Sequence, residues 1–238
     1  ELETEDLIEK EDVVITITNS GYAKRIPIDT YKAQKRGGKG IKGTTTKEED
    51  FVQDLFITNT HSHVLFFSDK GKVYWKKAYT IPEGSRYAKG TPLVNLIEIE
   101  KGEQIKATIV VNEFKEDQYL VFATKKGMIK KTALKEYSNP RKGGIIAINL
   151  REDDDLINVS MTNGSEEIMI ATKDGRAVRF KEGDVSVVGR NSIGVRGINI
   201  KESEVIGMEI CSREPYILTV TEKGYGKMSE VQDYRLIN

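Results

Sequence analysis

The sequence predicts an all-β, propeller-like fold made of repeated four-stranded blades, with about 50 residues in each repeat. Three observations support this prediction. A hairpin pattern recurs five times within the 238 residues. The spacing of the pattern matches the period of a propeller blade and exceeds that of the common helical repeats. No segment keeps the long 3.6-residue apolar period of an amphipathic helix, so we expect little helix.

Each repeat opens with a β-hairpin. An apolar run is followed by Ser or Thr, two polar residues and Gly. A second run then follows, and it includes Lys or Arg residues. Glycine supplies the positive φ that a tight turn needs, and the hydroxyl three positions earlier can bond a loop amide. The turn glycines are Gly21, Gly71, Gly127, Gly175 and Gly224, which lie 50, 56, 48 and 49 residues apart.

The remainder of each period predicts two more strands. A glycine-containing loop opens onto an apolar run about 19 residues after the hairpin turn, and an acidic turn then leads into an alternating strand. After the loop glycines Gly40, Gly90, Gly144 and Gly194, we expect apolar-run strands that begin at Ile41 and span 93–97, 145–150 and 195–200. We expect the alternating strands at 48–57, 103–111, 153–161 and 202–210.

The repeats divide the chain into an acidic linker, residues 1–12, and a single β-domain, residues 13–238. That domain holds four full repeats and the first hairpin of a fifth. A repeat cannot bury its apolar faces alone, so the ring must close. The sequence leaves two ways in which the ring could close. Either a further C-terminal portion completes the last blade, or the N-terminal strand completes it.

The composition is that of a globular protein, with 38% hydrophobic and 31% charged residues. No apolar run approaches the roughly 20 residues that cross a bilayer. The acidic N-terminus is unlike a secretory signal, and the lone Cys211 rules out an internal disulfide framework. We therefore expect no membrane association and a reducing, cytoplasmic location.

The first glycine loop is the most unusual segment. It reads Gln34-Lys35-Arg36-Gly37-Gly38-Lys39-Gly40, with Lys42 just beyond. Glycines let the backbone approach a surface closely, and Lys and Arg neutralise phosphates. Taken alone, the loop would be read as a solvated basic turn. Later repeats carry degenerate copies of it that each retain an Arg, which favours a phosphate-binding role.

Basic residues also follow the hairpin turns. Equivalent positions of a ring face the same way, so we expect the cations of loops and hairpins to form a basic belt around the rim. A segregated belt creates a local field that the formal charge of zero hides. The predicted rim residues are Lys24, Arg25, Lys42, Lys76, Lys77, Arg86, Lys89, Lys130, Lys131, Arg141, Lys142, Arg176, Arg179, Arg190, Arg196 and Lys227.

The period, the hairpin Gly21-Tyr22-Ala23-Lys24-Arg25 and the seven-residue loop at 34–40 resemble the C-terminal domain of the DNA gyrase A protein. The box of that family reads Gln-(Arg/Lys)-Arg-Gly-Gly-(Lys/Arg)-Gly, and all seven positions fit. The resemblance covers essentially the whole chain. It implies a β-pinwheel, a relative of the propeller in which blades exchange strands. The partial fifth repeat departs from the six blades usual in gyrase.

The resemblance also implies a function. The family domain wraps double-stranded DNA around its basic rim without sequence specificity and presents a neighbouring segment for passage, which leads to negative supercoils. The box, residues 34–40, is needed for supercoiling in that family. The chain would act with the rest of gyrase A and with gyrase B, as A2B2, in the bacterial cytoplasm and nucleoid. The isolated domain is expected to be a monomer.

We expect no catalytic activity and no cofactor of this chain itself. No Ser/His/Asp or Cys/His arrangement is evident, and His61 and His63 lack further ligands placed to hold a metal. The resemblance assigns the cleaving tyrosine, ATP and Mg²⁺ to other parts of an ATP-dependent type II topoisomerase. Two alternatives are the C-terminal domain of topoisomerase IV, which usually lacks an intact box, and a protein-interaction β-propeller.

The acidic linker carries seven acids and one base, a net charge of −6, so residues 13–238 carry +6. It is either a solvated linker end or a tail that competes with DNA for the basic surface. Under the second interpretation, removal of residues 1–12 would tighten DNA binding.

Overall fold

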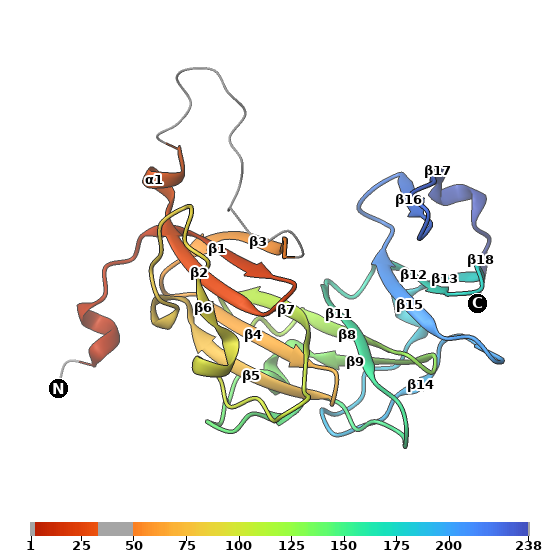
Figure 1. The fold of residues 1–238 in the computed structure, drawn as a ribbon. Helices are drawn as coiled ribbons and strands as arrows, with labels where there is room; N and C mark the ends of the chain where they lie inside the picture. The colour runs from red at the N-terminus through yellow and green to blue at the C-terminus, as the bar shows by residue number, and fades with distance from the viewer. Residues whose placement is uncertain (1–2, 33–49, 238) are drawn as a thin grey trace. The chain divides into compact units, whose positions relative to one another are not determined.

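Four four-stranded sheets and one two-stranded hairpin follow one another in the computed structural model, which describes residues 3–32 and 50–237 (Figure 1). The predicted all-β class and the four-stranded repeat are confirmed. The chain forms two compact units. The first unit contains residues 1–66, 73–113 and 140–145, and the second contains residues 67–72, 114–139 and 146–238.

The first unit holds the first two sheets, except for the tip of the second hairpin and Ile146, which belong to the second unit. In spatial order, the first sheet contains β3 (Val52–Asn59), β1 (Asp12–Thr18), β2 (Tyr22–Pro27) and β6 (Thr91–Pro92). The second contains β10 (Ile145–Ile146), β5 (Lys72–Lys77), β4 (His63–Ser68) and β7 (Ile105–Val111).

The second unit holds the remaining strands. The third sheet contains β11 (Leu156–Thr162), β8 (Tyr119–Thr124), β9 (Met128–Ala133) and β14 (Val195–Arg196). The fourth contains β15 (Val205–Ile210), β12 (Glu167–Thr172), β13 (Ala177–Lys181) and β18 (Leu236–Ile237). The fifth hairpin pairs β16 (Tyr216–Val220) with β17 (Gly226–Glu230).

Helical structure is short, as expected. The single α-helix among the described residues is α1 (Ile28–Lys32), which directly follows the first hairpin. Short 3₁₀ turns follow each of the later hairpins. One more follows β6, and another lies near the N-terminus. They span Thr4–Leu7, Ala78–Thr80, Leu93–Asn95, Leu134–Tyr137, Glu182–Asp184 and Val231–Asp233.

The hairpin turns have the predicted chemistry. All five turn glycines have φ between +80° and +88°. In four turns the hydroxyl accepts a bond from the amide four residues later, as Thr18 Oγ1 does from Tyr22 N at 3.1 Å. In the fourth repeat the Thr172 hydroxyl instead bonds Asp174 and the Arg176 carbonyl. The local signal of hydroxyl and glycine therefore sufficed to place every turn.

Consecutive repeats exchange strands. The glycine loop of each later repeat supplies the outer strand of the preceding sheet, so β6 pairs with β2, β10 joins β5 and β14 pairs with β9. The exchange is anchored at the hairpin turn, whose glycine carbonyl accepts an amide from the incoming loop. These bonds are Leu93 N to Gly21 O, Ala147 N to Gly71 O and Gly197 N to Gly127 O, each 2.8 Å.

The exchanged strands are shorter than predicted. We expected strands over 93–97, 145–150 and 195–200, but regular pairing spans only two residues in each case, at 91–92, 145–146 and 195–196. The chain leaves the sheet because its next amides bond the turn glycine, as Ala147 N and Ile148 N both do with Gly71 O. The apolar residues that follow are buried without being strand, among them Leu93, Ile148 and Ile198.

Each unit has its own core between successive sheets. In the first unit, Val13, Ile15 and Ile17 of β1 pack with Val64 and Phe66 of β4. In the second unit, Val121 and Ala123 of β8 pack with Ile168 and Ile170 of β12. Central strands are buried on both faces, which is why β1 reads as a nearly continuous apolar run.

Gly127→Val tests the turn at the third hairpin. Gly127 has φ +88°, and a Cβ there would lie 2.6 Å from Ile198 O, so both strain and overlap oppose a side chain. We expect the melting temperature to fall by roughly 5 to 15 °C. Gly175→Val is the matched control, because Gly175 has φ +84° but open space around its Cβ. Equal losses for the two variants would contradict the packing account.

Candidate nucleic-acid interface

The box at residues 34–40 and the neighbouring Lys42 lie outside the described residues, as does the strand expected to begin at Ile41. The candidate interface is therefore built from the later glycine loops.

Three of these loops occupy equivalent places. Their glycines Gly90, Gly144 and Gly194 have φ of +96°, +76° and +90°. Each packs on the residue two positions after the preceding turn glycine. A Cβ on Gly90 would lie 2.7 Å from Ala23 O, one on Gly144 would lie 3.1 Å from Val73 O, and one on Gly194 would overlap Ile129 O. The repeat therefore presents each loop in the same setting.

Several loop cations reach solvent. Arg141, Lys142 and Arg196 are exposed. Lys142 Nζ lies 3.6 Å from Glu98 Oε1, but both side chains are more than half exposed, and such pairs contribute only about 0–1 kcal/mol. Lys89 is also exposed, and its Nζ sits 3.8 Å from the centre of the Tyr22 ring. These ammonium and guanidinium groups can bind a phosphate at little cost in lost internal interactions.

Two other loop cations are partly buried. Arg190 donates from its guanidinium to the Ile146 carbonyl, and its backbone amide faces the Glu136 carboxylate. Arg86 is half-buried within its loop. Arg190 helps to hold its loop in shape, while part of each side chain remains accessible.

The third station, defined as the residue three positions after the turn glycine, requires a correction. We predicted that Lys24 and Lys130 lie on the rim, but both are buried, with 2% and 0% exposure. Lys24 Nζ donates to the carbonyls of Ser85, Arg86 and Ala88 at 3.2, 2.7 and 2.9 Å. Three acceptors match the three hydrogens of an ammonium group. Lys130 Nζ donates to the carbonyls of Ala147 and Arg190.

The fourth station, one residue later, also holds cations that join consecutive repeats. Arg25 Nε donates to Ile81 O at 3.0 Å, and Arg179 Nη1 donates to the equivalent Tyr234 O at 3.0 Å. Arg179 also forms an ion pair with Glu167. Lys131 is 5% exposed, and its Nζ lies 3.4 Å from the buried Glu182 carboxylate. Lys24, Lys130 and Lys131 therefore do not present their charge at the surface, and we remove them from the candidate interface.

The sequence contained a signal for this burial. The third station is Tyr74 in the second repeat and Val178 in the fourth, and the fourth station is Trp75 in the second. Apolar or aromatic residues at equivalent positions indicate a packed site. A cation in the same place is then more consistent with a bond to buried carbonyls than with a solvent-facing charge.

The remaining hairpin cations differ from one another. Lys227 is exposed and Lys76 is half-buried. Arg176 donates to the Asn199 and Ile200 carbonyls and pairs with Asp174 at 2.8 Å. Hydrogen bonds from Thr172 and Arg176 lower the pKa of Asp174 to about 2.

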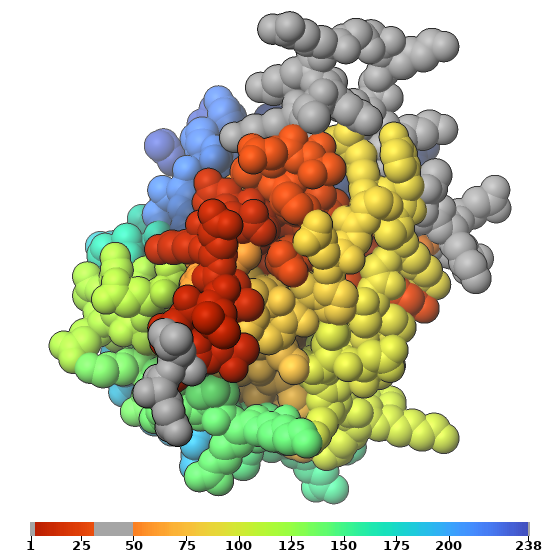
Figure 2. Space-filling view, turned by 90° about the vertical axis from the view of Figure 1, so that its left-hand side faces the viewer, coloured from red at the N-terminus to blue at the C-terminus, as the bar shows by residue number. Residues whose placement is uncertain are grey.

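The acidic linker contacts Lys77, and Figure 2 shows the linker lying against the first unit. Lys77 Nζ lies 2.8 Å from Glu5 Oε1, and the same carboxylate oxygen lies 3.2 Å from His61 Nδ1. The bond from Lys77 lowers the pKa of Glu5. The linker is held further by Thr60 Oγ1, which donates to Glu9 O at 2.7 Å. Part of the linker is therefore docked on the first unit.

Two of the acidic turns lie beside hairpin turns. Lys70 pairs with Asp155 at 3.3 Å, and Lys125 pairs with Glu204 at 3.4 Å. The turn lysines thus face acidic partners, whereas Arg141 and Arg196 lie on or directly beside a glycine loop.

Among residues 3–32 and 50–237, no helix is long and apolar enough to span a membrane. The same residues contain no group of three or more His, Cys, Asp or Glu side chains placed to hold a metal ion.

Comparisons with known proteins agree with the repeat. The family model of the DNA gyrase C-terminal domain, a β-propeller, matches five segments, residues 12–59, 62–112, 118–163, 166–212 and 215–238. The DNA gyrase A protein of Staphylococcus aureus strain NCTC 8325 is 48% identical over 242 aligned positions, which cover 100% of this chain. The chain spans only 27% of that relative's length.

Two solved structures have the same fold. The C-terminal domain of DNA topoisomerase IV superposes with a TM-score of 0.83 at 30% identity, covering 97% of this chain and 71% of that chain. A gyrase A C-terminal domain superposes with a TM-score of 0.72 at 27% identity, covering 96% and 74%.

Lys130→Met tests the buried third station. Burial lowers the pKa of Lys130 to about 7, and the nearby Arg190 charge adds to this effect. A neutral amine still has two N–H groups for its two carbonyl acceptors. In the unfolded chain the pKa is near 10.5, so between about pH 7 and 10 only the unfolded state is protonated and stability rises with pH. We expect the melting temperature of the wild type to rise relative to Lys130→Met across that window.

Melting curves of both proteins from about pH 6.5 to 9.5, recorded by circular dichroism, measure this difference. Lys125→Met, at a partly exposed ion pair, is the control and should show no such trend. A constant difference between wild type and Lys130→Met across the window would contradict a titrating buried amine.

Proposed function

The chain belongs to the family of DNA gyrase C-terminal domains, and on that premise we propose that it binds double-stranded DNA without reading its sequence and wraps it along a basic surface. One observation carries the proposal. The glycine loops recur in equivalent settings on successive repeats and bring exposed cations with them, at Lys89, Arg141, Lys142 and Arg196.

Such a surface suits phosphates better than bases. Lys and Arg side chains on short loops can touch the backbone of a duplex, which carries no base identity. Many such contacts offset the elastic cost of bending DNA. Binding should therefore be weakly specific and strongly dependent on salt.

The first glycine loop completes the proposed surface. Residues 34–40 match the seven-residue family box, and we propose that Lys35, Arg36 and Lys39 make the contacts that commit DNA to the wrapped path. Lys42 and the exposed cations of the later loops extend that path.

We further propose that the chain acts within the gyrase A protein, together with gyrase B, in the bacterial cytoplasm and nucleoid. There it would wrap DNA so that ATP-driven strand passage introduces negative supercoils. Strand cleavage, ATP and Mg²⁺ would belong to other parts of that type II topoisomerase, and the isolated chain would be monomeric.

The acidic linker would compete with DNA for this basic surface. The Glu5 carboxylate already forms an ion pair with Lys77, one of the predicted rim cations, with Oε1 2.8 Å from Nζ. This contact supports the interpretation of the linker as a competitor of DNA over that of a solvated end.

A role in topoisomerase IV is the second candidate, because the topoisomerase IV domain superposes more closely than the gyrase domain. The intact seven-residue box favours gyrase. The two candidates differ in outcome, since wrapping by a gyrase domain is coupled to the introduction of negative supercoils.

A topology assay tests the proposal. The chain is incubated with relaxed circular plasmid, a type I topoisomerase is added, and the recovered DNA is resolved by gel electrophoresis. We expect the wild type to leave writhe in the plasmid. The triple variant Lys35→Ala, Arg36→Ala, Lys39→Ala should leave none, because its box no longer neutralises phosphates.

The matched control replaces three turn lysines, Lys70, Lys125 and Lys126, by Ala. It removes the same charge from positions outside the glycine loops, where Lys70 and Lys125 face acidic partners and Lys126 donates to the Glu152 carbonyl, so writhe should persist. If the box variant retained full writhe while folding normally, the role assigned to residues 34–40 would be lost. If the wild type produced none, the wrapping proposal itself would fail.

A further inference from the structure

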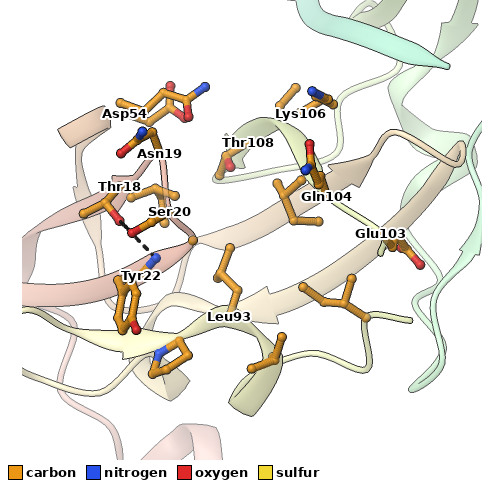
Figure 3. A pocket seen from close by; sticks show the side chains of 18 residues that line it. Thr18, Asn19, Ser20, Tyr22, Asp54, Leu93, Glu103, Gln104, Lys106 and Thr108 are labelled. Atoms are coloured by element: carbon orange, nitrogen blue, oxygen red, sulfur yellow. Dashed lines mark hydrogen bonds between the residues drawn. The ribbon is translucent and has the colours of Figure 1, made fainter. Parts of the chain in front are cut away.

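A cleft of about 550 Å³ opens in the first unit, between the first hairpin turn and β7 (Figure 3). Asp54 and Asn19 lie on one wall, Gln104 and Thr108 lie on the opposite wall, and Leu93 lies below them. The volume is within the usual range for small-ligand sites, about 300–1,000 Å³.

The cleft occupies a place that later repeats close. In the second unit, the carbonyl two residues before the turn glycine accepts an amide from the next alternating strand. Leu156 N bonds Asp69 O at 2.9 Å, and Val205 N bonds Lys125 O at 2.8 Å. The equivalent pair in the first unit is Ile105 and Asn19, and no such bond joins these two residues, both of which the structure describes. This backbone hydrogen bond between consecutive repeats is therefore missing at the first junction and present at the next two.

Asp54 adds a charge to this opening that has no partner among the described residues 3–32 and 50–237. It lies opposite Ile17 in the sheet, and the residues in the equivalent register positions are the neutral Asn158 and Gly207. The Asp54 side chain is half-buried and makes no hydrogen bond or ion pair with any residue in the described ranges. Burial raises its pKa. A partly desolvated carboxylate without a partner is costly, and an ordered cation would relieve that cost.

The other residues that line the cleft indicate which kind of cation would fit it. Ile17, Pro92, Leu93 and Ile99 give the cleft an apolar floor that fits a chain of methylene groups. Of the other charged lining residues, Glu103 accepts a hydrogen bond from the Tyr74 hydroxyl at 2.6 Å, and Lys106 is exposed. Asp54 is thus the charged group left to pair with a ligand.

We propose that this cleft binds the ammonium group of an unbranched alkylamine, with Asp54 as its counter-ion and the apolar floor against its methylene chain. Two sources share this chemistry, a free aliphatic diamine and a lysine side chain of another protein. The test of this site uses no DNA, so its outcome is independent of the proposed DNA binding.

Titration of the ¹⁵N-labelled 238-residue chain tests the site. The probes are 1,4-diaminobutane and Nα-acetyl-lysine N-methylamide at about pH 7.5, and the readout is the amide shifts of Asn19, Leu93 and Thr108. We expect saturable shifts with at least one probe, and the tighter probe identifies the source. Asp54→Asn should weaken binding about tenfold or more, because it removes the charge at nearly constant shape.

Asp117→Asn, at an exposed carboxylate in the second unit, is the matched control and should bind like the wild type. The melting temperature of Asp54→Asn should equal or exceed that of the wild type, since a desolvated charge is relieved. Two results would overturn the site: no saturable shift with either probe up to about 20 mM, or equal affinity in the wild type and a folded Asp54→Asn.

Discussion

The exchange of outer strands between consecutive repeats is the constraint on which the rest of the structure depends. A glycine loop from one repeat lies on the hairpin of the repeat before it, and its amide bonds the carbonyl of the turn glycine at 2.8 Å in all three described cases. The approach is so close that Gly90 and Gly194 leave no room for a Cβ. Each hairpin turn therefore fixes the conformation of its own repeat and the position of the next loop.

This constraint separates the basic residues into two groups. Some cations on the hairpin strands bond carbonyls of the next repeat and join the two repeats, as Lys24 does with Arg86 O and Arg25 does with Ile81 O. Cations on the loops themselves, such as Arg141 and Arg196, remain at the surface. The buried group holds the loops in shape, and the exposed group supplies the charge that we propose DNA contacts. A net charge of zero conceals this division, because exposed cations at one position are balanced by acids at another.

Local chemistry made the fold predictable from the sequence, whereas long-range contacts limited the prediction of the site. A hydroxyl and a glycine three residues apart define each hairpin turn within a single segment, so all five turns were placed correctly. The burial of Lys130 depends on the Arg190 carbonyl, 60 residues away. Only the apolar residues at equivalent stations, Tyr74 and Val178, indicated it. The role of the box at 34–40 remains a prediction, because those residues lie outside the described ranges.

The salt dependence of DNA affinity tests the division between loop and hairpin cations most directly. Each phosphate contact contributes about 0.9 to the slope of log affinity against log salt concentration. The account predicts that Arg141→Ala with Lys142→Ala lowers the slope by up to about 2 without changing the melting temperature. It predicts that Lys24→Met lowers the melting temperature and leaves the slope of the folded protein unchanged. The reverse pattern, a smaller slope for folded Lys24→Met and an unchanged slope for the loop variant, would contradict it.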